Sequence, residues 1–312
     1  MAEGWREGDE VIMPSFTYVS TANAFAKFGV TPVFADVDIN DMNISVESIK
    51  ALITPKTKAI VAVHYGGVAC NIDSILEICS ANNILLVEDA AHTFDSYYKE
   101  KRLGTLGSYG AISFDHTKNI HCGQGGALIV NDAEKVKKIA TVFENGTNRE
   151  EFLNKDVPYF EWVSLGSKYA LSELNAAFLL PQLESSSAIT EQRILIWNSY
   201  YELLKKLSPK FIDLPVIPEY AIHNGHIFYI KLKNQAERDK LKTYLSKKGV
   251  NTAFHFIPLH NSEYGKRYAI VKHRPINTET ESERLLRLPI YYGMSMEDVL
   301  LVTKYIQDFF ES

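Results

Sequence analysis

Short apolar runs alternate with helical patterns along the first half of the chain. The apolar runs predict buried strands at 10–16, 31–37, 59–65, 84–90, 111–115 and 127–132. Patterns with helical spacing lie at 20–28, 46–53, 73–82 and 133–144. Nearly continuous apolar strands separated by helices are typical of a mostly parallel sheet that is covered on both faces. We therefore predict an α/β fold for this half.

The middle of the chain is rich in helix-forming residues. Residues 169–207 predict one long helix or two consecutive helices, with a bend at Pro181 because proline interrupts the helical hydrogen bonds. Several prolines between 209 and 218 then mark an irregular connection. We place a domain boundary there, and predict a large α/β domain over 1–208 and a smaller α+β domain over 209–312.

The C-terminal part shows a second, shorter alternation of apolar and helical patterns. Apolar runs at 227–233 and 252–259 flank a helical pattern at 236–248. We expect the last helix to begin after Ser295, whose hydroxyl suits an N-cap, because Asp298 stands at the capping-box position three residues on.

Composition and charge exclude several classes of partner. The 312 residues are 46% hydrophobic and 23% charged, with a net charge of −5, so there is no basic excess that would indicate nucleic acid or an anionic membrane. No apolar run approaches the ~18 residues of a membrane span, and the first ten residues hold no apolar signal core. Cys70, Cys79 and Cys122 are scattered, which argues against a disulfide framework. We expect a cytoplasmic protein.

Polar side chains gather where the predicted strands end. Tyr18 follows the first strand, Asp89 and His92 follow another, and Ser113 and Lys118 flank the end of a third. In an open parallel sheet, ligands bind beyond the carboxyl ends of the strands. We therefore expect these five side chains to share one site.

These residue types match the needs of pyridoxal phosphate. That cofactor requires a lysine for its aldehyde, a carboxylate opposite the ring nitrogen, a flat face against the ring and donors for the phosphate. Lys118 is the candidate lysine and Asp89 the candidate carboxylate, with Tyr18 against the ring and Ser113 at the phosphate. Once released, the lysine amine can also move a proton at the substrate carbon.

Each residue also has a plain structural interpretation. A lysine after a strand is often solvated, Asp89 with its neighbour Glu88 is compatible with a helix cap, and Tyr18 with a core position. The glycines of "CGQGG" match neither a Walker loop nor a dinucleotide fingerprint, and no such fingerprint follows the first strand. A Rossmann-type dehydrogenase is therefore disfavoured. Histidine pairs at 223/226 and 255/260 lack supporting cysteines or carboxylates, so we predict no metal site.

Several blocks resemble a known family. In order, "DEVIMPSFTYVSTANAF", "VEDAAH", "SFDHTKN", "GQGGALIVND" and "HFIPLH" resemble the DegT-like sugar-nucleotide aminotransferases, which are fold-type I pyridoxal phosphate enzymes. The blocks "VSTANAF", "VHYGGVAC" and "ESERLLRLP" resemble most the transaminases that form dTDP-4-amino-4,6-dideoxygalactose, a sugar of enterobacterial common antigen and lipopolysaccharide biosynthesis. The resemblance runs from about residue 8 to the C-terminus.

The resemblance implies a role for each candidate residue. Lys118 takes the place of the lysine that binds the cofactor covalently, and Asp89 the place of the partner of the pyridine nitrogen. His92 corresponds to a side chain near the cofactor's O3′, Tyr18 to the stacked aromatic ring and Ser113 to a phosphate ligand. In related dehydratases a histidine replaces the lysine, so Lys118 argues for amino transfer.

The resemblance further implies substrates and assembly. An amino group would move from L-glutamate to C4 of a dTDP-4-keto-6-deoxy sugar in a homodimer, with His255 and His260 near the substrate. Family members carry several dozen residues ahead of the strand "EVIM", including a helix N-terminus that holds the phosphate. We expect this chain to lack that segment. The alternative is therefore a catalytically impaired, truncated paralogue that binds nucleotide sugar or a partner subunit without turnover.

Overall fold

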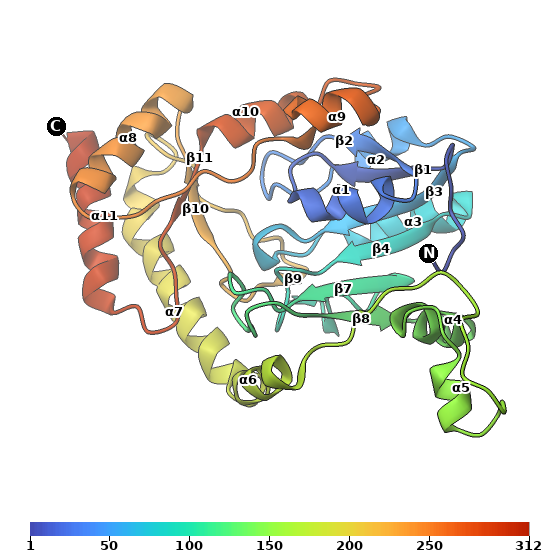
Figure 1. The fold of residues 1–312 in the computed structure, drawn as a ribbon. Coiled ribbons are helices and arrows are strands. Elements are labelled where there is room, and N and C mark those ends of the chain that lie inside the picture. The colour runs from blue at the N-terminus through green and yellow to red at the C-terminus, as the bar shows by residue number, and fades with distance from the viewer. Residues whose placement is uncertain (312) are drawn as a thin grey trace.

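The computed structural model describes residues 1–311 and confirms the α/β fold (Figure 1). A six-stranded sheet has the order β2-β1-β3-β4-β7-β8. Its strands are β1 (Glu10–Pro14), β2 (Thr31–Ala35), β3 (Thr57–Val63), β4 (Leu85–Asp89), β7 (Tyr109–Ser113) and β8 (Gly126–Val130). All neighbouring pairs are parallel except β7 with β8. The sheet is therefore mostly parallel, with its carboxyl ends along one edge.

Helices cover both faces of this sheet, as the near-continuous apolar strands require. The helices that follow the strands are α1 (Val19–Ala26), α2 (Val46–Leu52), α3 (Ile72–Asn82) and α4 (Ala133–Phe143), with α5 (Arg149–Leu153) beyond. One apolar core joins α2 and α3 to one face of the sheet, and another joins α1 to the opposite face. Ser45, Asn71 and Asp132 cap α2, α3 and α4 with side-chain oxygens.

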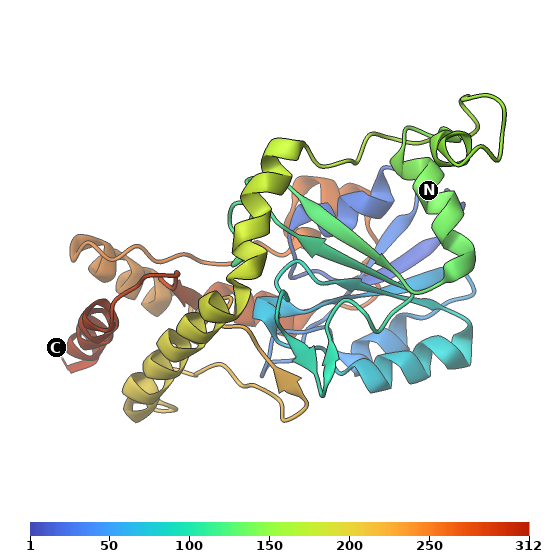
Figure 2. The ribbon, with the colours of Figure 1, turned by 90° about the horizontal axis from the view of Figure 1, so that it is seen from below.

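The middle segment forms two helices, α6 (Glu173–Glu184) and α7 (Ser186–Leu204), which meet at an angle in Figure 2. The bend expected at Pro181 lies instead at Ser185, where φ of −97° and ψ of 6° leave the helical range. Pro181 stays inside α6, and its carbonyl accepts a hydrogen bond from Ser185 N at 3.1 Å.

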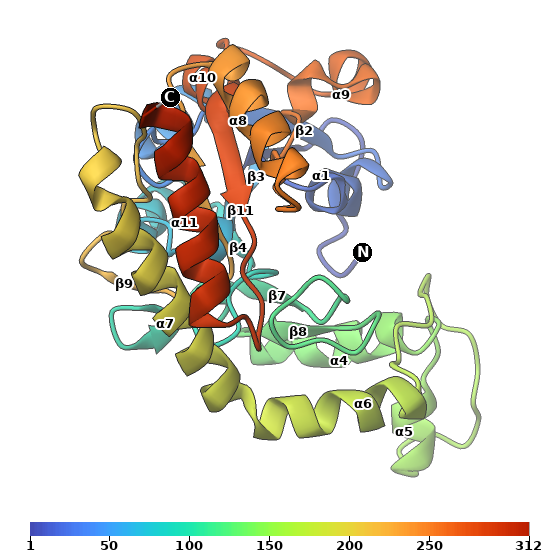
Figure 3. The ribbon, with the colours of Figure 1, turned by 90° about the vertical axis from the view of Figure 1, so that its left-hand side faces the viewer.

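A second unit is built around two antiparallel strands, β10 (Phe228–Lys231) and β11 (Leu285–Leu288). Its helices are α8 (Gln235–Lys247), α10 (Ile276–Arg284) and α11 (Met296–Glu311). Figure 3 shows α7, α8 and α11 around these strands, and their apolar side chains form one core. Residues 196–204 of α7 belong to this core, whereas Ile189, near the start of α7, packs in a core of the first unit. The chain therefore passes from one core to the other within α7. The domain limits given above stay a prediction.

Short elements complete the fold. They are the three-stranded sheet β6 (Lys101–Arg102), β5 (Tyr97–Tyr98) and β9 (Ala221–Ile222), the helix α9 (Glu263–Tyr268), and the single turns η1 (Tyr65–Gly67), η2 (Lys205–Leu207) and η3 (Leu259–Asn261). The apolar run 252–259 forms no strand; it touches β11 by one bridge and then returns to the large sheet, where Leu259 joins the core.

The last helix begins where the sequence predicts. Ser295 Oγ accepts from the backbone N of Asp298 at 3.1 Å, and the Asp298 carboxylate accepts from Ser295 N at 3.3 Å. This reciprocal pair is the expected capping box. Among residues 1–311, no helix is both long enough and apolar enough to cross a membrane.

Candidate active site

A cavity of about 620 Å³ lies beyond the carboxyl ends of β3, β4 and β7. Six of the seven side chains predicted for the site line it: Tyr18, Asp89, His92, Ser113, Lys118 and His255. The opposite wall comes from the second unit through His226, Phe256 and Arg287. The structure therefore brings together residues that are far apart in sequence, as a parallel sheet edge does. Their roles remain predictions.

Asp89 ends β4 with its carboxylate held in place. One oxygen accepts from the Thr21 hydroxyl at 2.6 Å, and the other accepts from Ala91 N at 3.2 Å. The Thr21 hydroxyl is itself 2.8 Å from that of Thr17, which lies two residues before α1 begins. A fixed carboxylate on a cavity wall is what a protonated ring nitrogen requires as its partner.

The neighbouring Glu88 anchors β4 from the other side of the strand. It is fully buried and accepts hydrogen bonds from the backbone N of Gly104, Leu106 and Gly107, and from His64 Nε2 at 3.0 Å. Burial opposes its ionisation, but these donors outweigh burial and lower the pKa of Glu88. Glu88 thus fixes the strand end that carries Asp89, which rules out a helix-capping role for this carboxylate.

Lys118 lies in the loop after β7, and its amine has neither a hydrogen bond nor an ion pair among residues 1–311. Burial lowers the pKa of this amine, opposed by the charges of Asp89 and Asp115 and assisted by Arg287. A lowered pKa favours the neutral, nucleophilic amine that attacks an aldehyde.

The loop that carries Lys118 is folded back on itself. His116 N donates to Gly123 O, and Phe114 N donates to Gly125 O, both at 2.8 Å. A Cβ on Gly125 would collide with Cys122 Sγ, so any other residue there would have to displace that buried side chain. The glycines of this loop thus have a structural role near Lys118. Ser113 Oγ accepts from Asp115 N at 3.3 Å, at the start of the same loop.

Three histidine rings form one side of the cavity. The ring centroids of His92 and His226 are 4.2 Å apart, and those of His92 and His255 are 6.2 Å apart. Burial lowers the pKa of all three, and that of His255 to about 2. They are therefore neutral. Because His92 Nδ1 accepts from Gly66 N at 3.2 Å, its Nε2 carries the proton and is available as a donor.

Tyr18 stands at the mouth of the cavity rather than in a core. Its side chain is 62% exposed and tilts against Phe256, with ring centroids 6.4 Å apart. An exposed aromatic face beside a cavity is compatible with a stacked cofactor ring. The core interpretation of Tyr18 is therefore wrong.

His260 is the one predicted site residue that the structure places off the cavity wall. It is buried, with Nδ1 2.7 Å from Ser15 Oγ, and Nε2 donates to Glu279 at 3.2 Å. These contacts fasten η3 to the end of β1. His260 lies within the turn η3 and His255 precedes it, which explains why two histidines of one motif have different surroundings.

Sequence reasoning missed several polar residues of the site, among them Thr17, Thr21, His226 and Arg287. Thr17 and Thr21 are four residues apart at the start of a helix, a spacing that puts two hydroxyls on one face. Arg287 interrupts the apolar strand "LLRLP", and a charge inside such a run is a signal that was available. His226 carries no comparable local signal.

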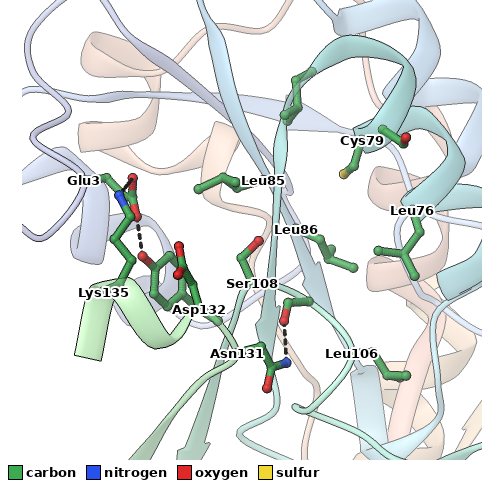
Figure 4. A pocket seen from close by; sticks show the side chains of 14 residues that line it. Glu3, Leu76, Cys79, Leu85, Leu86, Leu106, Ser108, Asn131, Asp132 and Lys135 are labelled. Carbon is green, nitrogen blue, oxygen red and sulfur yellow. Dashed lines mark hydrogen bonds and ion pairs between the residues drawn. The ribbon is translucent and has the colours of Figure 1, made fainter. Parts of the chain in front are cut away.

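A second cavity, of about 460 Å³, lies at the opposite edge of the sheet (Figure 4). It is lined by the first residues of β4 and β7, and by Glu3 and Lys135. Glu3 accepts hydrogen bonds from Lys135, at 3.2 Å, and from the hydroxyl of Tyr109. Glu3 and Lys135 are thus paired with each other, unlike the amine of Lys118. In residues 1–311 no three His, Cys, Asp or Glu side chains are placed so that together they could hold a metal ion.

Known proteins resemble this chain along nearly all of its length. A model of the DegT/DnrJ/EryC1/StrS aminotransferase family matches residues 1–307. The aminotransferase TlmJ of Streptoalloteichus hindustanus has a TM-score of 0.89 at 28% identity, covering 98% of this chain and 80% of its own. An aminotransferase of the same family from Brucella abortus has a TM-score of 0.88 at 29% identity, and the match covers 98% of this chain and 80% of that protein. DesV of S. venezuelae, solved in complex with a ketimine intermediate, has a TM-score of 0.90 at 27% identity, and the match covers 100% of this chain and 81% of that protein.

Proposed function

Because this chain belongs to the DegT/DnrJ/EryC1/StrS aminotransferase family, we propose that it transfers an amino group from L-glutamate to C4 of a dTDP-4-keto-6-deoxy sugar with pyridoxal phosphate. The observation that carries the proposal is the amine of Lys118 and the carboxylate of Asp89 on the wall of one cavity. The blocks "VSTANAF", "VHYGGVAC" and "ESERLLRLP" support the choice of sugar.

The residues of the cavity fit this cofactor. Asp89 offers a fixed carboxylate for the ring nitrogen, and Lys118 an unpaired amine of lowered pKa for the aldehyde. Ser113 offers a hydroxyl for the phosphate, His92 a donor for the ring oxygen and Tyr18 a face for stacking. Bound there, pyridoxal phosphate would supply a sink for the electrons released at the substrate carbon.

The protein's own contribution is proton transfer and orientation. The Lys118 amine, when free, takes the proton from the amino-bearing carbon of the donor and returns a proton on the acceptor side. Asp89 holds the proton of the ring nitrogen by charge, and Thr21 keeps that carboxylate in position.

The first experiment tests covalent capture of the cofactor. We expect the purified chain to bind pyridoxal phosphate and to show a visible absorption band that is absent in Lys118→Ala. Lys56→Ala, at an exposed lysine next to the amino end of β3, is the matched control and should keep the band. A folded protein that takes up no cofactor would contradict the proposal.

The second experiment tests the reaction. We expect glutamate-dependent amination of a dTDP-4-keto-6-deoxy sugar, with product identified by mass and by nuclear magnetic resonance at C4. The UDP counterpart serves as the comparison substrate. Binding of the sugar nucleotide without transfer, by a protein that does hold the cofactor, would favour the non-catalytic alternative.

We further propose that the enzyme works as a homodimer in the cytoplasm and makes a sugar of enterobacterial common antigen and lipopolysaccharide biosynthesis. Support for the dimer comes from the family resemblance and from the many exposed large apolar side chains between 143 and 180. Light scattering of the cofactor-loaded protein measures the mass directly. A monomer at micromolar concentration would contradict the dimer.

A further inference from the structure

Arg287 places a positive charge on the cavity wall from an otherwise apolar strand. It lies in β11 between Leu286 and Leu288, both of which are buried in the core of the second unit. Because side chains alternate along a strand, Arg287 points to the opposite side, where it lines the cavity with Lys118 and His255.

The guanidinium of Arg287 has no partner within residues 1–311. Its Nε is buried without a hydrogen bond, and no carboxylate forms an ion pair with the group. Three other arginines with little exposure do have partners. Arg193 donates to three backbone carbonyls, Arg284 pairs with Glu281 and Asp213, and Arg238, whose Nε also lacks a hydrogen bond, forms an ion pair with Asp239. Because an unpaired buried cation is unfavourable, the arrangement is that of a binding group awaiting an anion.

The carboxylates of the cavity do not supply that anion. Asp89 accepts from Thr21 and Ala91, and Asp115 accepts from the hydroxyl and backbone N of Thr117. The three histidines near Arg287 are neutral, so they do not compete for an anion as cations. The partner of the guanidinium must therefore enter with a ligand.

We infer that Arg287 binds the α-carboxylate of the amino donor, an inference that rests on the proposed function. An amino acid carries that carboxylate on the same carbon as the reacting amine, so it must lie close to the Lys118 amine during transfer. The diphosphate of a sugar nucleotide is attached to C1, across the sugar ring from C4, and so lies farther from the reacting atoms. The planar guanidinium matches a carboxylate with two parallel hydrogen bonds.

The surroundings of Arg287 strengthen such a contact. The charge of Arg287 acts on the pKa of Tyr65, which is buried, and on those of His255 and Lys118. In such a poorly solvated wall, a charge-assisted hydrogen bond is worth more than in water. Arg287 is thus placed to select donors that carry an α-carboxylate over simple amines.

The test uses the donor half-reaction. Adding the donor to the cofactor-loaded protein should abolish the cofactor's visible absorption, and the rate of that loss is measured. In Arg287→Met, we expect the second-order rate constant for L-glutamate to fall by roughly 10- to 100-fold. L-glutamine keeps the α-carboxylate but not the distal one, and should lose as much. Arg287→Lys keeps the charge without the planar pair of donors, so its rate constant should lie between those of the parent and Arg287→Met.

A binding measurement removes any ambiguity from the chemistry. 2-Methyl-L-glutamate lacks the proton on the reacting carbon, so it binds without transfer and changes the absorption of the cofactor. We expect its Kd to rise by a similar factor in Arg287→Met. Arg267→Met, at an exposed arginine of α9 outside the cavity, is the matched control and should leave this Kd unchanged.

Four results would overturn the inference while leaving the proposed function intact, the first three of which concern the step or ligand affected. Those three are an unchanged donor step in Arg287→Met, a loss confined to the keto-sugar half-reaction, and a weakened affinity for pyridoxal phosphate. A loss for glutamate but not for glutamine would move the contact to the distal carboxylate and also overturn it. If the parent protein itself shows no donor step, the proposed function fails first. Thermal melting of Arg287→Met distinguishes a binding role from a structural one. If Arg287 serves binding, removing its unpaired charge should not lower the Tm.

Discussion

Thr21 is the only side chain within residues 1–311 that hydrogen-bonds to Asp89, at 2.6 Å. Replacing it with valine keeps the shape of the side chain but removes the donor to a carboxylate. We expect Thr21→Val to weaken the binding of pyridoxal phosphate about tenfold, because the loosened carboxylate no longer meets the ring nitrogen in one fixed position. Equilibrium titration with the cofactor measures this, and Thr21→Ser, which keeps the hydroxyl, should bind nearly as the parent does.

Lys118 gives the site a pH dependence. Its amine is neutral above its pKa, which burial lowers and which the charges of Asp89 and Asp115 raise. Asp115→Asn keeps an oxygen for Thr117 but removes one of these charges, so the pKa of Lys118 should fall further. The rate of cofactor capture against pH should then reach its half-maximum at a lower pH than in the parent.

Stopped-flow absorption measures this profile. Asp73→Asn, at an exposed aspartate paired with Lys99, is the control and should leave the midpoint where it is. A midpoint in Asp115→Asn that stays where it is in the parent, or moves to higher pH, would show that the charge of Asp115 does not raise the pKa of Lys118.

At the scale of single elements, α11 tests how far a local motif contributes to stability. Its capping box joins Ser295 and Asp298 through two backbone hydrogen bonds. We expect Ser295→Ala to lower the free energy of unfolding by about 1 kcal/mol, since the backbone N–H of Asp298 loses its partner and the Asp298 carboxylate loses the serine hydroxyl. Urea denaturation measures this loss. Ser199→Ala, in the interior of α7, should change stability by less, because alanine is the better helix former there.

The elements also show why the sequence predicted the fold well and the site in part. Each of the six strands has an apolar run of its own, so local pattern located them. The antiparallel direction of β8 depends on which edge the chain returns to, and no local pattern encodes that. Tyr18, Asp89 and Lys118 were found together because the carboxyl ends of parallel strands meet at one edge.

The opposite wall of the cavity was harder to predict. Arg287, His226 and His255 come from the second unit, and their approach to Lys118 depends on how two cores pack. His260 was grouped with His255 by proximity in sequence, yet the turn η3 carries it to Ser15 instead. A motif therefore located the segment, but only the tertiary structure separated the side chain on the cavity wall from the one behind it.

At the scale of the whole molecule, buried neutral histidines link stability to acid. The folded pKa of His255 is lowered from 6.5 to about 2, and that of His223 to about 4, so both stay neutral in the folded chain while the unfolded chain binds protons below pH 6.5. Their contribution is complete above that pH. As the pH falls from 6.5, the unfolded state gains protons first, and the free energy of unfolding must decrease.

We therefore expect the free energy of unfolding, measured by urea denaturation, to fall steadily from pH 7 to pH 5. Each such histidine contributes a slope of up to about 1.4 kcal/mol per pH unit. His255→Gln should make the dependence shallower. His273→Gln, at an exposed histidine outside the cavity, is the control and should leave the slope unchanged. A parent protein equally stable at both pH values would contradict the buried, neutral state of these rings.

The return of the chain to the large sheet has a practical consequence for dissecting this protein. Ile270 N donates to Pro32 O at 2.9 Å and its carbonyl accepts from Phe34 N at 3.0 Å, while Leu259 fills the core beside β1. An expression fragment that stops after α7 would leave the β2 edge bare and that core open. The first unit is thus completed by residues 259–270 from the second half of the chain. A shortened version that is to fold has to include the chain through at least residue 270.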